Sequence, residues 1–97
     1  MKIKVLKKTG NELKLEIEGE GHSFCNALQK VLLNEETVEI AGYTIPHPLT
    51  ANPVFHVRTQ KGRPETALRA AAEKLQKKTK QFNDAFEKAL KEWQPKQ

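Results

Sequence analysis

Three histidines and a single cysteine are the side chains of this chain that could bind a metal ion. His22 and Cys25 lie three positions apart at the expected start of a helix, which is a workable spacing for two ligands of a zinc ion. A complete site would also need His47 or His56, and His56 follows Phe55 in a strand-like run. Because a lone histidine is more often a capping or packing residue, we expect no bound metal.

Cys25 could also act as a nucleophile, because a position in the first turn of a helix lowers the pKa of a cysteine. No acid that would orient a catalytic base and no oxyanion-stabilising group is recognisable beside it, and the adjacent polar residue is Asn26. A buried, unreactive cysteine in a helix is the common outcome. We therefore expect no catalytic residue in this chain.

Gly19 and Gly21 precede the same helix and could let its N-terminus hold a phosphate group. Two glycines without the rest of a phosphate-binding loop are a weak pattern, and Glu20 between them would repel an anion. We expect no cofactor, and we interpret these glycines as a sharp turn from a strand into a helix.

The elements that position these residues begin with two strands. Residues 2–7 and 12–18 alternate between apolar and polar side chains, and a turn signal at residues 9–11 predicts that they form a hairpin. A helix is then predicted from Ser23, a favourable N-cap, to about Asn34. Its apolar residues cover a wider arc than one sheet face requires, which predicts a second apolar contact. They are Phe24, Ala27, Leu28, Val31, Leu32 and Leu33.

The second half of the chain predicts two further strands and a long helix. The strands cover residues 37–45 and 54–59, and Gly42 indicates a bulge or bend in the first of them. Pro64 stands where the first residue of a helix belongs, and nothing interrupts the helical pattern before Pro95. The helix carries a heptad seam with one polar member. The seam residues are Leu68, Ala72, Leu75, Thr79, Phe82, Phe86, Ala89 and Trp93.

The expected fold class is α+β, in the order β-β-α-β-β-α, with a four-stranded, mostly antiparallel sheet and two helices on one face. We expect residues 1–97 to form a single domain. Its C-terminal helix would cover about residues 64–93.

The predicted C-terminal helix is longer than the sheet is wide. About 30 helical residues span about 45 Å, whereas four strands span about 19 Å. The helix would therefore overhang the sheet and expose Phe82, Phe86, Leu90 and Trp93 as a surface for a partner. The alternative is that the helix is shorter or folds back, so that these side chains pack within the chain.

The net charge of +5 includes one dense patch, formed by Lys74, Lys77, Lys78 and Lys80. Such a run is usually a solvated helix face, and we favour this interpretation over a nucleic-acid contact. No apolar run is long enough to predict a membrane span, and the first residues lack the apolar segment of a secretory signal. A single cysteine is typical of a reducing compartment, so we expect a cytoplasmic protein.

The strand-to-helix junction resembles that of a known family. The junction motif consists of Gly19, Glu20, His22, Ser23 and Asn26, with Ser23 in place of the family's usual threonine. Leu28, Gly42-Tyr43, residues 46–49 and the long C-terminal helix also match in order, whereas Gly21 and Cys25 depart from the family pattern. The chain thus resembles the small alpha-like subunit family of archaeal and eukaryotic multisubunit RNA polymerases, whose archaeal members are called subunit L.

The resemblance implies a non-catalytic subunit of DNA-directed RNA polymerase, homologous to the bacterial alpha N-terminal dimerisation domain. It implies that residues 1–97 are a single alpha-like dimerisation domain. This domain would form a heterodimer with the larger alpha-like subunit of the polymerase, and the heterodimer would serve as an assembly platform for the large catalytic subunits. DNA would be contacted at most indirectly, and the junction motif would set local geometry. The interface is assigned to Phe24, Leu28, Val31, Leu32, Leu75, Phe82, Phe86 and Leu90.

Other functions are compatible with parts of the sequence. A stand-alone homodimer could use the same seam, because a symmetric interface needs one self-complementary patch on each chain. A small nucleic-acid-binding protein would need aromatic residues among basic ones on a sheet face, and the strands carry only Tyr43 and Phe55. A small enzyme lacks a catalytic constellation.

Overall fold

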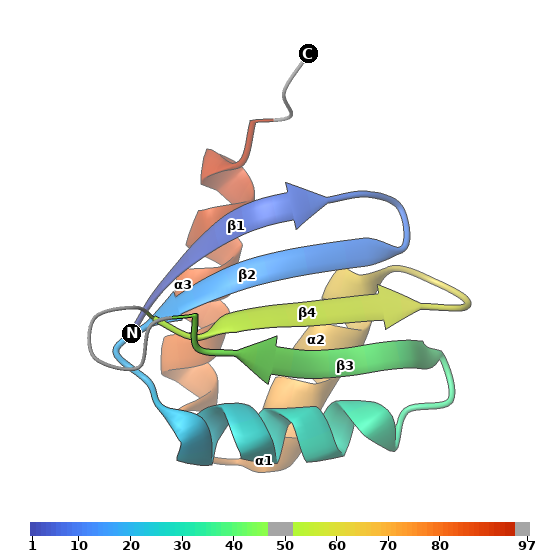
Figure 1. Ribbon diagram of the computed structural model, residues 1–97, viewed down its shortest axis with the longest axis horizontal. Helices are drawn as coiled ribbons and strands as arrows, with labels where there is room; N and C mark the ends of the chain where they lie inside the picture. Colours follow the sequence, from blue (N-terminus) through green and yellow to red (C-terminus); the bar gives the residue numbers. More distant parts are fainter. Residues whose placement is uncertain (47–51, 95–97) are drawn as a thin grey trace.

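The computed structural model describes residues 1–46 and 52–94. Within these residues it contains one four-stranded antiparallel sheet and three helices, in the order β-β-α-β-β-α-α. The predicted α+β class and the four-stranded sheet are confirmed. Helices α2 and α3 lie behind the sheet, and α1 lies along one edge of it (Figure 1).

The predicted N-terminal hairpin is confirmed as β1 (Lys2–Lys8) and β2 (Glu12–Glu18). The strands pair antiparallel, with Ile3 opposite Ile17. Alternate residues on both strands are buried, as their period of two predicts. The turn is closed by a 2.8 Å hydrogen bond from the N–H of Thr9 to the carbonyl of Glu12.

The remaining strands, β3 (Val38–Thr44) and β4 (Val54–Thr59), complete a sheet of order β1-β2-β4-β3. The predicted bulge at Gly42 is wrong, because Gly42 pairs regularly with His56. The register shifts instead near the beginning of β3, between Val38 and Ile40. A strand glycine permits an irregularity but does not impose one while the neighbouring pairs remain in register.

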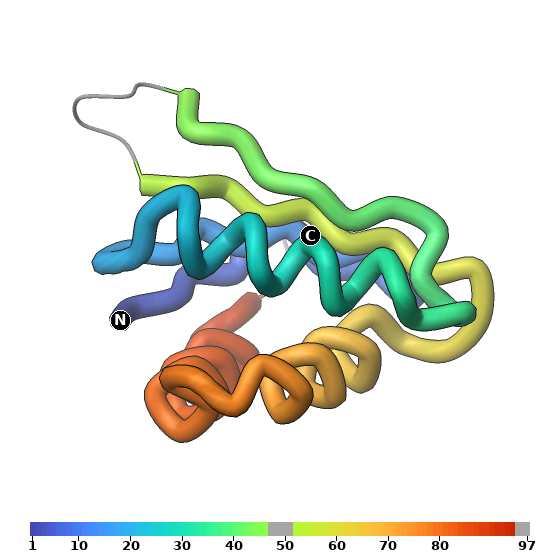
Figure 2. The backbone as a smooth tube through the Cα atoms, turned by 90° about the horizontal axis from the view of Figure 1, so that it is seen from below, coloured from blue at the N-terminus to red at the C-terminus, as the bar shows by residue number. Residues whose placement is uncertain are grey.

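The three helices pack on the same side of this sheet, with α1 at its β3 edge. Helix α1 (His22–Leu33) contacts β3 and α2, helix α2 (Pro64–Leu75) contacts β2 and β4, and helix α3 (Thr79–Glu92) contacts β1. Figure 2 shows α2 and α3 together on the side of the sheet where α1 also packs. The core lies between these two layers and includes residues from every strand and helix.

The predicted single helix over residues 64–93 is wrong, because α2 and α3 are separate helices that meet at a corner. At this corner Gln76 and Lys78 adopt left-handed backbone conformations, with φ of 57° and 56°. The change of direction carries α3 beneath β1 (Figure 1). The C-terminal end of α3 still passes the β1 edge of the sheet (Figure 1), but Phe82 and Phe86, which the sequence predicted to be exposed there, are buried. Pro95 lies outside the described residues.

Burial of aromatic side chains explains the corner. Phe82 and Phe86 on α3 are both fully buried. Burial of a large apolar side chain contributes about 1.5–3 kcal/mol, whereas a left-handed conformation costs a non-glycine residue about 1–2 kcal/mol. The two buried phenylalanines thus offset the two left-handed residues, and the alternative in which the helix folds back is confirmed.

Candidate partner interface

The junction between β2 and α1 turns the chain at Gly19, where φ is 92°. A Cβ at this position would lie 3.6 Å from the Cα of Met1, which is ordinary contact, so the backbone conformation is what requires glycine. The turn predicted from the sequence is confirmed, and it directs α1 along the β3 edge of the sheet.

Helix α1 begins at His22, and its N-cap is Gly21. The carbonyl of Gly21 accepts a hydrogen bond from the N–H of Cys25 at 3.3 Å. The predicted N-cap at Ser23 is wrong, because the backbone is already helical at the preceding residue. Ser23 and Asn26 are exposed on the first turn of the helix.

His22 connects the start of α1 to β3. Its Nδ1 atom lies 3.0 Å from the hydroxyl oxygen of Tyr43, and the same hydroxyl donates to the carbonyl of His22 at 3.4 Å. The two rings are also in contact, with centroids 5.6 Å apart. This arrangement agrees with the role predicted for the junction motif, which is to set geometry.

Acidic residues at both ends of α1 pair with lysines that flank the α2–α3 corner. Both carboxylate oxygens of Glu20 lie within 3.0 Å of the Lys78 ammonium, and the side chain of Glu20 is 8% exposed. Glu35, beyond the other end of α1, pairs with Lys74. Two members of the lysine patch therefore have specific partners. These partners lie 58 and 39 residues away in the sequence, so no local pattern could predict the pairs.

The rest of the lysine patch agrees with the predicted solvated face. Lys77 is exposed at the corner itself. Lys80 lies 2.8 Å from Asp84, one turn later on α3, and both side chains are largely exposed. Because solvent screens so exposed a pair, it contributes little to the stability of the helix.

The interface residues assigned to α1 differ in accessibility. Leu28 and Leu32 are fully buried, and Phe24 is 9% exposed. Val31 is half-buried at the margin of the core. Only Val31 among these four residues therefore offers much apolar surface outside the chain.

The interface residues assigned to the C-terminal region show the same division. Phe82 and Phe86 are fully buried, whereas Leu75 and Leu90 are half-buried at the edge of the core. The ring of Phe82 lies 5.9 Å from that of Phe24 on α1. The seam predicted to meet a partner is thus largely occupied by contacts within the chain.

A side-chain bridge joins α2 to α3. Arg69 donates from Nε and an Nη atom to the two carboxylate oxygens of Glu87, at 3.0 and 2.7 Å. The bond raises the pKa of Arg69 and lowers the pKa of Glu87. The guanidinium also lies 5.7 Å from the centre of the Phe86 ring. The bridge joins residues 18 positions apart, so no local pattern could reveal it.

The residues considered as a nucleophile or as metal ligands lie in environments that do not favour these roles. Cys25 is fully buried, and burial raises the pKa of its thiol to about 11, which disfavours the reactive thiolate. His56 lies 3.0 Å from Glu12, where Lys7 and His56 together hold the Glu12 pKa at about 2. His47 is outside the described residues. Within residues 1–46 and 52–94, no three His, Cys, Asp or Glu side chains are grouped as metal ligands.

The helices were also compared with the length and hydropathy that a membrane span requires. None of the helices in the described segments is both long and apolar enough to cross a bilayer.

Comparison with known families identifies one match. Residues 12–85 match the family model of the RNA polymerase Rpb3/Rpb11 dimerisation domain. The matched range runs from β2 through α1, β3, β4 and α2 into α3. It therefore includes the junction, the corner and most of the predicted interface.

Individual relatives are similar over nearly the whole chain. Subunit Rpo11 of DNA-directed RNA polymerase from Methanocella arvoryzae is 41% identical over 92 residues, covering 94% of this chain and 99% of that protein. The Rpo11 subunit from Pyrococcus horikoshii is 44% identical over 94 residues, with the same coverage. The crystal structure of RNA polymerase subunit L from Thermoplasma acidophilum matches with a TM-score of 0.70 and 27% identity, over 96% of each chain.

Proposed function

Because the chain belongs to the RNA polymerase Rpb3/Rpb11 dimerisation domain family, we propose that it is a non-catalytic subunit of a cytoplasmic, multisubunit DNA-directed RNA polymerase. It binds the larger alpha-like subunit of that polymerase. The heterodimer is the platform on which the large catalytic subunits assemble. In this proposal the fold is shared with the N-terminal dimerisation domain of bacterial alpha.

The observation that carries this proposal is the extent of the similarity. Relatives named as Rpo11 subunits align over 94% of this chain and 99% of their own length, so the similarity is not confined to one motif. A dimerisation domain needs an apolar surface for a second chain, and this fold has apolar residues at the outer margin of its helical layer.

We assign the accessible part of the interface to Val31 on α1 and to Leu75 and Leu90 on α2 and α3, all half-buried at the edge of the core. The other members of the predicted set are buried in the core, against which these three residues pack. They are Phe24, Leu28, Leu32, Phe82 and Phe86. Apolar side chains that complete their burial only in a complex are typical contributors to binding energy.

Sedimentation equilibrium tests the proposal with this chain alone and mixed with the larger alpha-like subunit from the same organism. We expect a one-to-one complex to replace the free chains. A stable homodimer that ignores the added subunit would contradict the proposal and support the stand-alone homodimer. Two species that sediment independently would also contradict it.

A matched pair of variants locates the interface. Val31→Asp places a charge on the proposed surface and should weaken the complex by about tenfold or more. Ile40→Asp makes the same kind of change on β3, where Ile40 is 42% exposed and lines a hollow with His56 and Lys14 of neighbouring strands. It should leave the affinity within about twofold of the unmodified chain. Equal effects of the two changes would contradict the assignment.

A further inference from the structure

We propose that the outer edge of β1 is a docking site for an extended segment of another protein, in which apolar and acidic residues alternate. The segment adds to the sheet as a further strand, beside β1 and over the C-terminal end of α3. The groove at this edge shares no residue with the interface assigned above. The inference therefore goes beyond the proposed function and does not depend on it.

Strand β1 lies at an edge of the sheet. Within the described residues, the order β1-β2-β4-β3 gives it one neighbour, β2. Half of the backbone N–H and C=O groups of an edge strand point away from the sheet, where another strand can bind them. The pairing with β2 is regular from Lys2 to Val5, and the register shifts between Val5 and Lys7. The regular edge that a docked segment can use is therefore residues 2–5.

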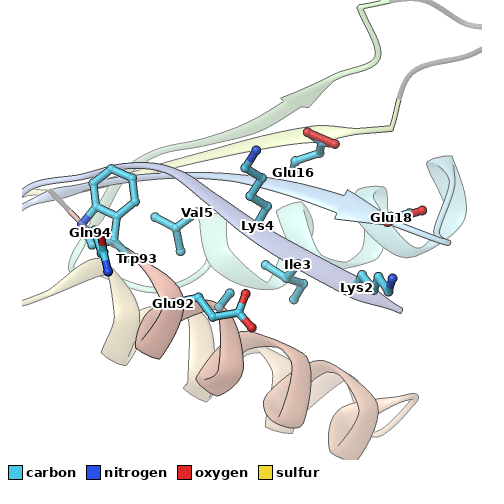
Figure 3. Close-up of a pocket in the computed structure, with 10 residues that line it drawn as sticks. Lys2, Ile3, Lys4, Val5, Glu16, Glu18, Glu92, Trp93 and Gln94 are labelled. Carbon is cyan, nitrogen blue, oxygen red and sulfur yellow. The ribbon is translucent and has the colours of Figure 1, made fainter. Parts of the chain in front are cut away.

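The helical layer extends beyond this edge. The C-terminal end of α3 passes β1 (Figure 1), so a strand added beside β1 would lie on the helix. A groove of about 520 Å³ marks this place, with Ile3 and Val5 on one side and Ala89 and Trp93 on the other (Figure 3). Trp93 is half-buried, so an apolar side chain in the groove would complete its burial. Because strand residues alternate between faces, every second residue of the segment is apolar.

The other face of β1 is basic. Lys4 points away from α3 (Figure 3), and Lys2 lies on the same face because it is two residues earlier in the strand. Neither lysine forms an ion pair within residues 1–46 and 52–94. On β2, Glu18 and Glu16 lie opposite them. Since opposite charges on neighbouring strands are favourable, the charges predict an acidic strand on the open side of β1 as well.

Charge also distinguishes this occupant from a second copy of the chain. The charged residues of β1 are Lys2, Lys4, Lys7 and Lys8. Pairing of β1 with β1 of another copy, with the apolar faces on one side, would place lysine opposite lysine, which is unfavourable. Lysines at an edge thus discourage self-association while they favour an acidic segment. Glu92 lines the α3 side of the groove and disfavours acidic residues there, so the acidic residues of the segment face outward.

The fluorescence of Trp93 tests the inference, because it is the only tryptophan of the chain and lines the groove. The probe is a peptide of about six residues with blocked ends, in which aspartate alternates with valine. We expect the emission to shift to shorter wavelengths and to saturate as the peptide is added. The backbone amide NMR signals of residues 2–5 should shift in the same titration.

The matched control is the same peptide with lysine in place of aspartate. It should bind at least about tenfold more weakly, because its charges face those of Lys2 and Lys4. Equal binding of the two peptides, or no response to the aspartate peptide, would overturn the inference. Both titrations use the full chain without a second subunit, so their failure leaves the proposed function intact.

A charge reversal on β1 locates the site. Lys4→Glu should weaken binding of the aspartate peptide by about fivefold and strengthen binding of the lysine peptide. Lys14→Glu is the control, because Lys14 is also exposed on the outer face but belongs to β2 and lies opposite Lys7, beyond the regular edge. It should leave both affinities within about twofold of the unmodified chain. Equal effects of the two substitutions would place peptide binding elsewhere and overturn the inference.

Discussion

The chain reverses direction sharply at two places, and the two turns are built in different ways. At the junction before α1, the left-handed residue is Gly19, for which a φ of 92° carries little strain. At the corner between α2 and α3, the left-handed residues are Gln76 and Lys78, which prefer a helical backbone. The first turn is therefore specified by its own sequence, and the second by what packs around it.

This difference separates a fixed part of the molecule from a conditional one. The junction fixes where α1 starts against β3, and its residues make short contacts such as that between His22 and Tyr43. The corner exists because α3 gains buried contacts beneath β1. The position of α3 therefore depends on these buried contacts, whereas the turn at Gly19 depends on the backbone of one residue.

The largest expected effect comes from removing what holds the corner. Phe82→Ala deletes a fully buried aromatic ring that contacts the rings of Phe24 and Phe86. We expect a loss of about 3–5 kcal/mol in the free energy of unfolding, measured by urea denaturation. Leu33→Ala, at a position that is 52% exposed on α1, is the control and should change stability by about 0.5 kcal/mol or less. Similar stabilities for the two variants would show that α3 does not hold the corner through Phe82.

The junction is tested by changing its two glycines. Gly19→Ala places a side chain on a left-handed residue and should destabilise the chain by about 1–2 kcal/mol. Gly21→Ala is the matched control, because Gly21 has an extended backbone and open space around its Cα. It should cost no more than about 1 kcal/mol, through the weaker capping of alanine. Thermal denaturation of both variants separates the two costs, and equal losses would contradict the distinct role of Gly19.

The corner should respond to glycine in the opposite direction. Gln76→Gly relieves a left-handed residue and should stabilise the folded chain by about 0.5–1 kcal/mol. Gln76→Ala is the control and should leave the stability of the free chain nearly unchanged, since alanine shares the strain of glutamine there. A glycine variant that is less stable than the alanine variant would show that the corner is not strained.

Sequence patterns predicted the parts of this fold that depend on local residues. Alternation in residues 2–7 and 12–18 predicted the hairpin, and the glycine at position 19 predicted the junction turn. The heptad seam correctly identified the apolar face of the C-terminal region. It did not reveal the corner, because Gln76 and Lys78 carry no turn signal and the left-handed backbone is imposed by burial of Phe82 and Phe86.

The interface residues remain a prediction, and the sequence could not indicate which of them are accessible. The sequence placed Val31 on the apolar arc of the first helix, and Leu75 and Leu90 along the seam of the C-terminal region. Which of them remain accessible depends on the direction of α3, which rests on long-range contacts. The same limit concealed the Arg69–Glu87 bridge, whose partners belong to different helices.

Acidification should weaken the attachment of α3 to α2, and this is the smallest of the predicted effects on stability. The bond from Arg69 holds the pKa of Glu87 below its ordinary value of 4.5. The charged carboxylate therefore stabilises the folded chain at neutral pH, and this contribution is lost as the pH falls from about 4.5 through the lower folded-state pKa of Glu87. Because both side chains are nearly half exposed, solvent screens the pair and the contribution is about 0.2–1 kcal/mol.

Thermal denaturation of the unmodified chain and of Glu87→Gln, at pH 7 and near pH 2, measures this contribution. The variant should be less stable at pH 7, and the difference should shrink in acid, where Glu87 of the unmodified chain is also becoming neutral. A difference that persists in acid would assign the effect of the substitution to packing. The junction offers a contrast, since Gly19 has no ionisable side chain, so the loss caused by Gly19→Ala should be the same at both pH values. Acid would then distinguish a turn fixed by backbone conformation from one held partly by charge.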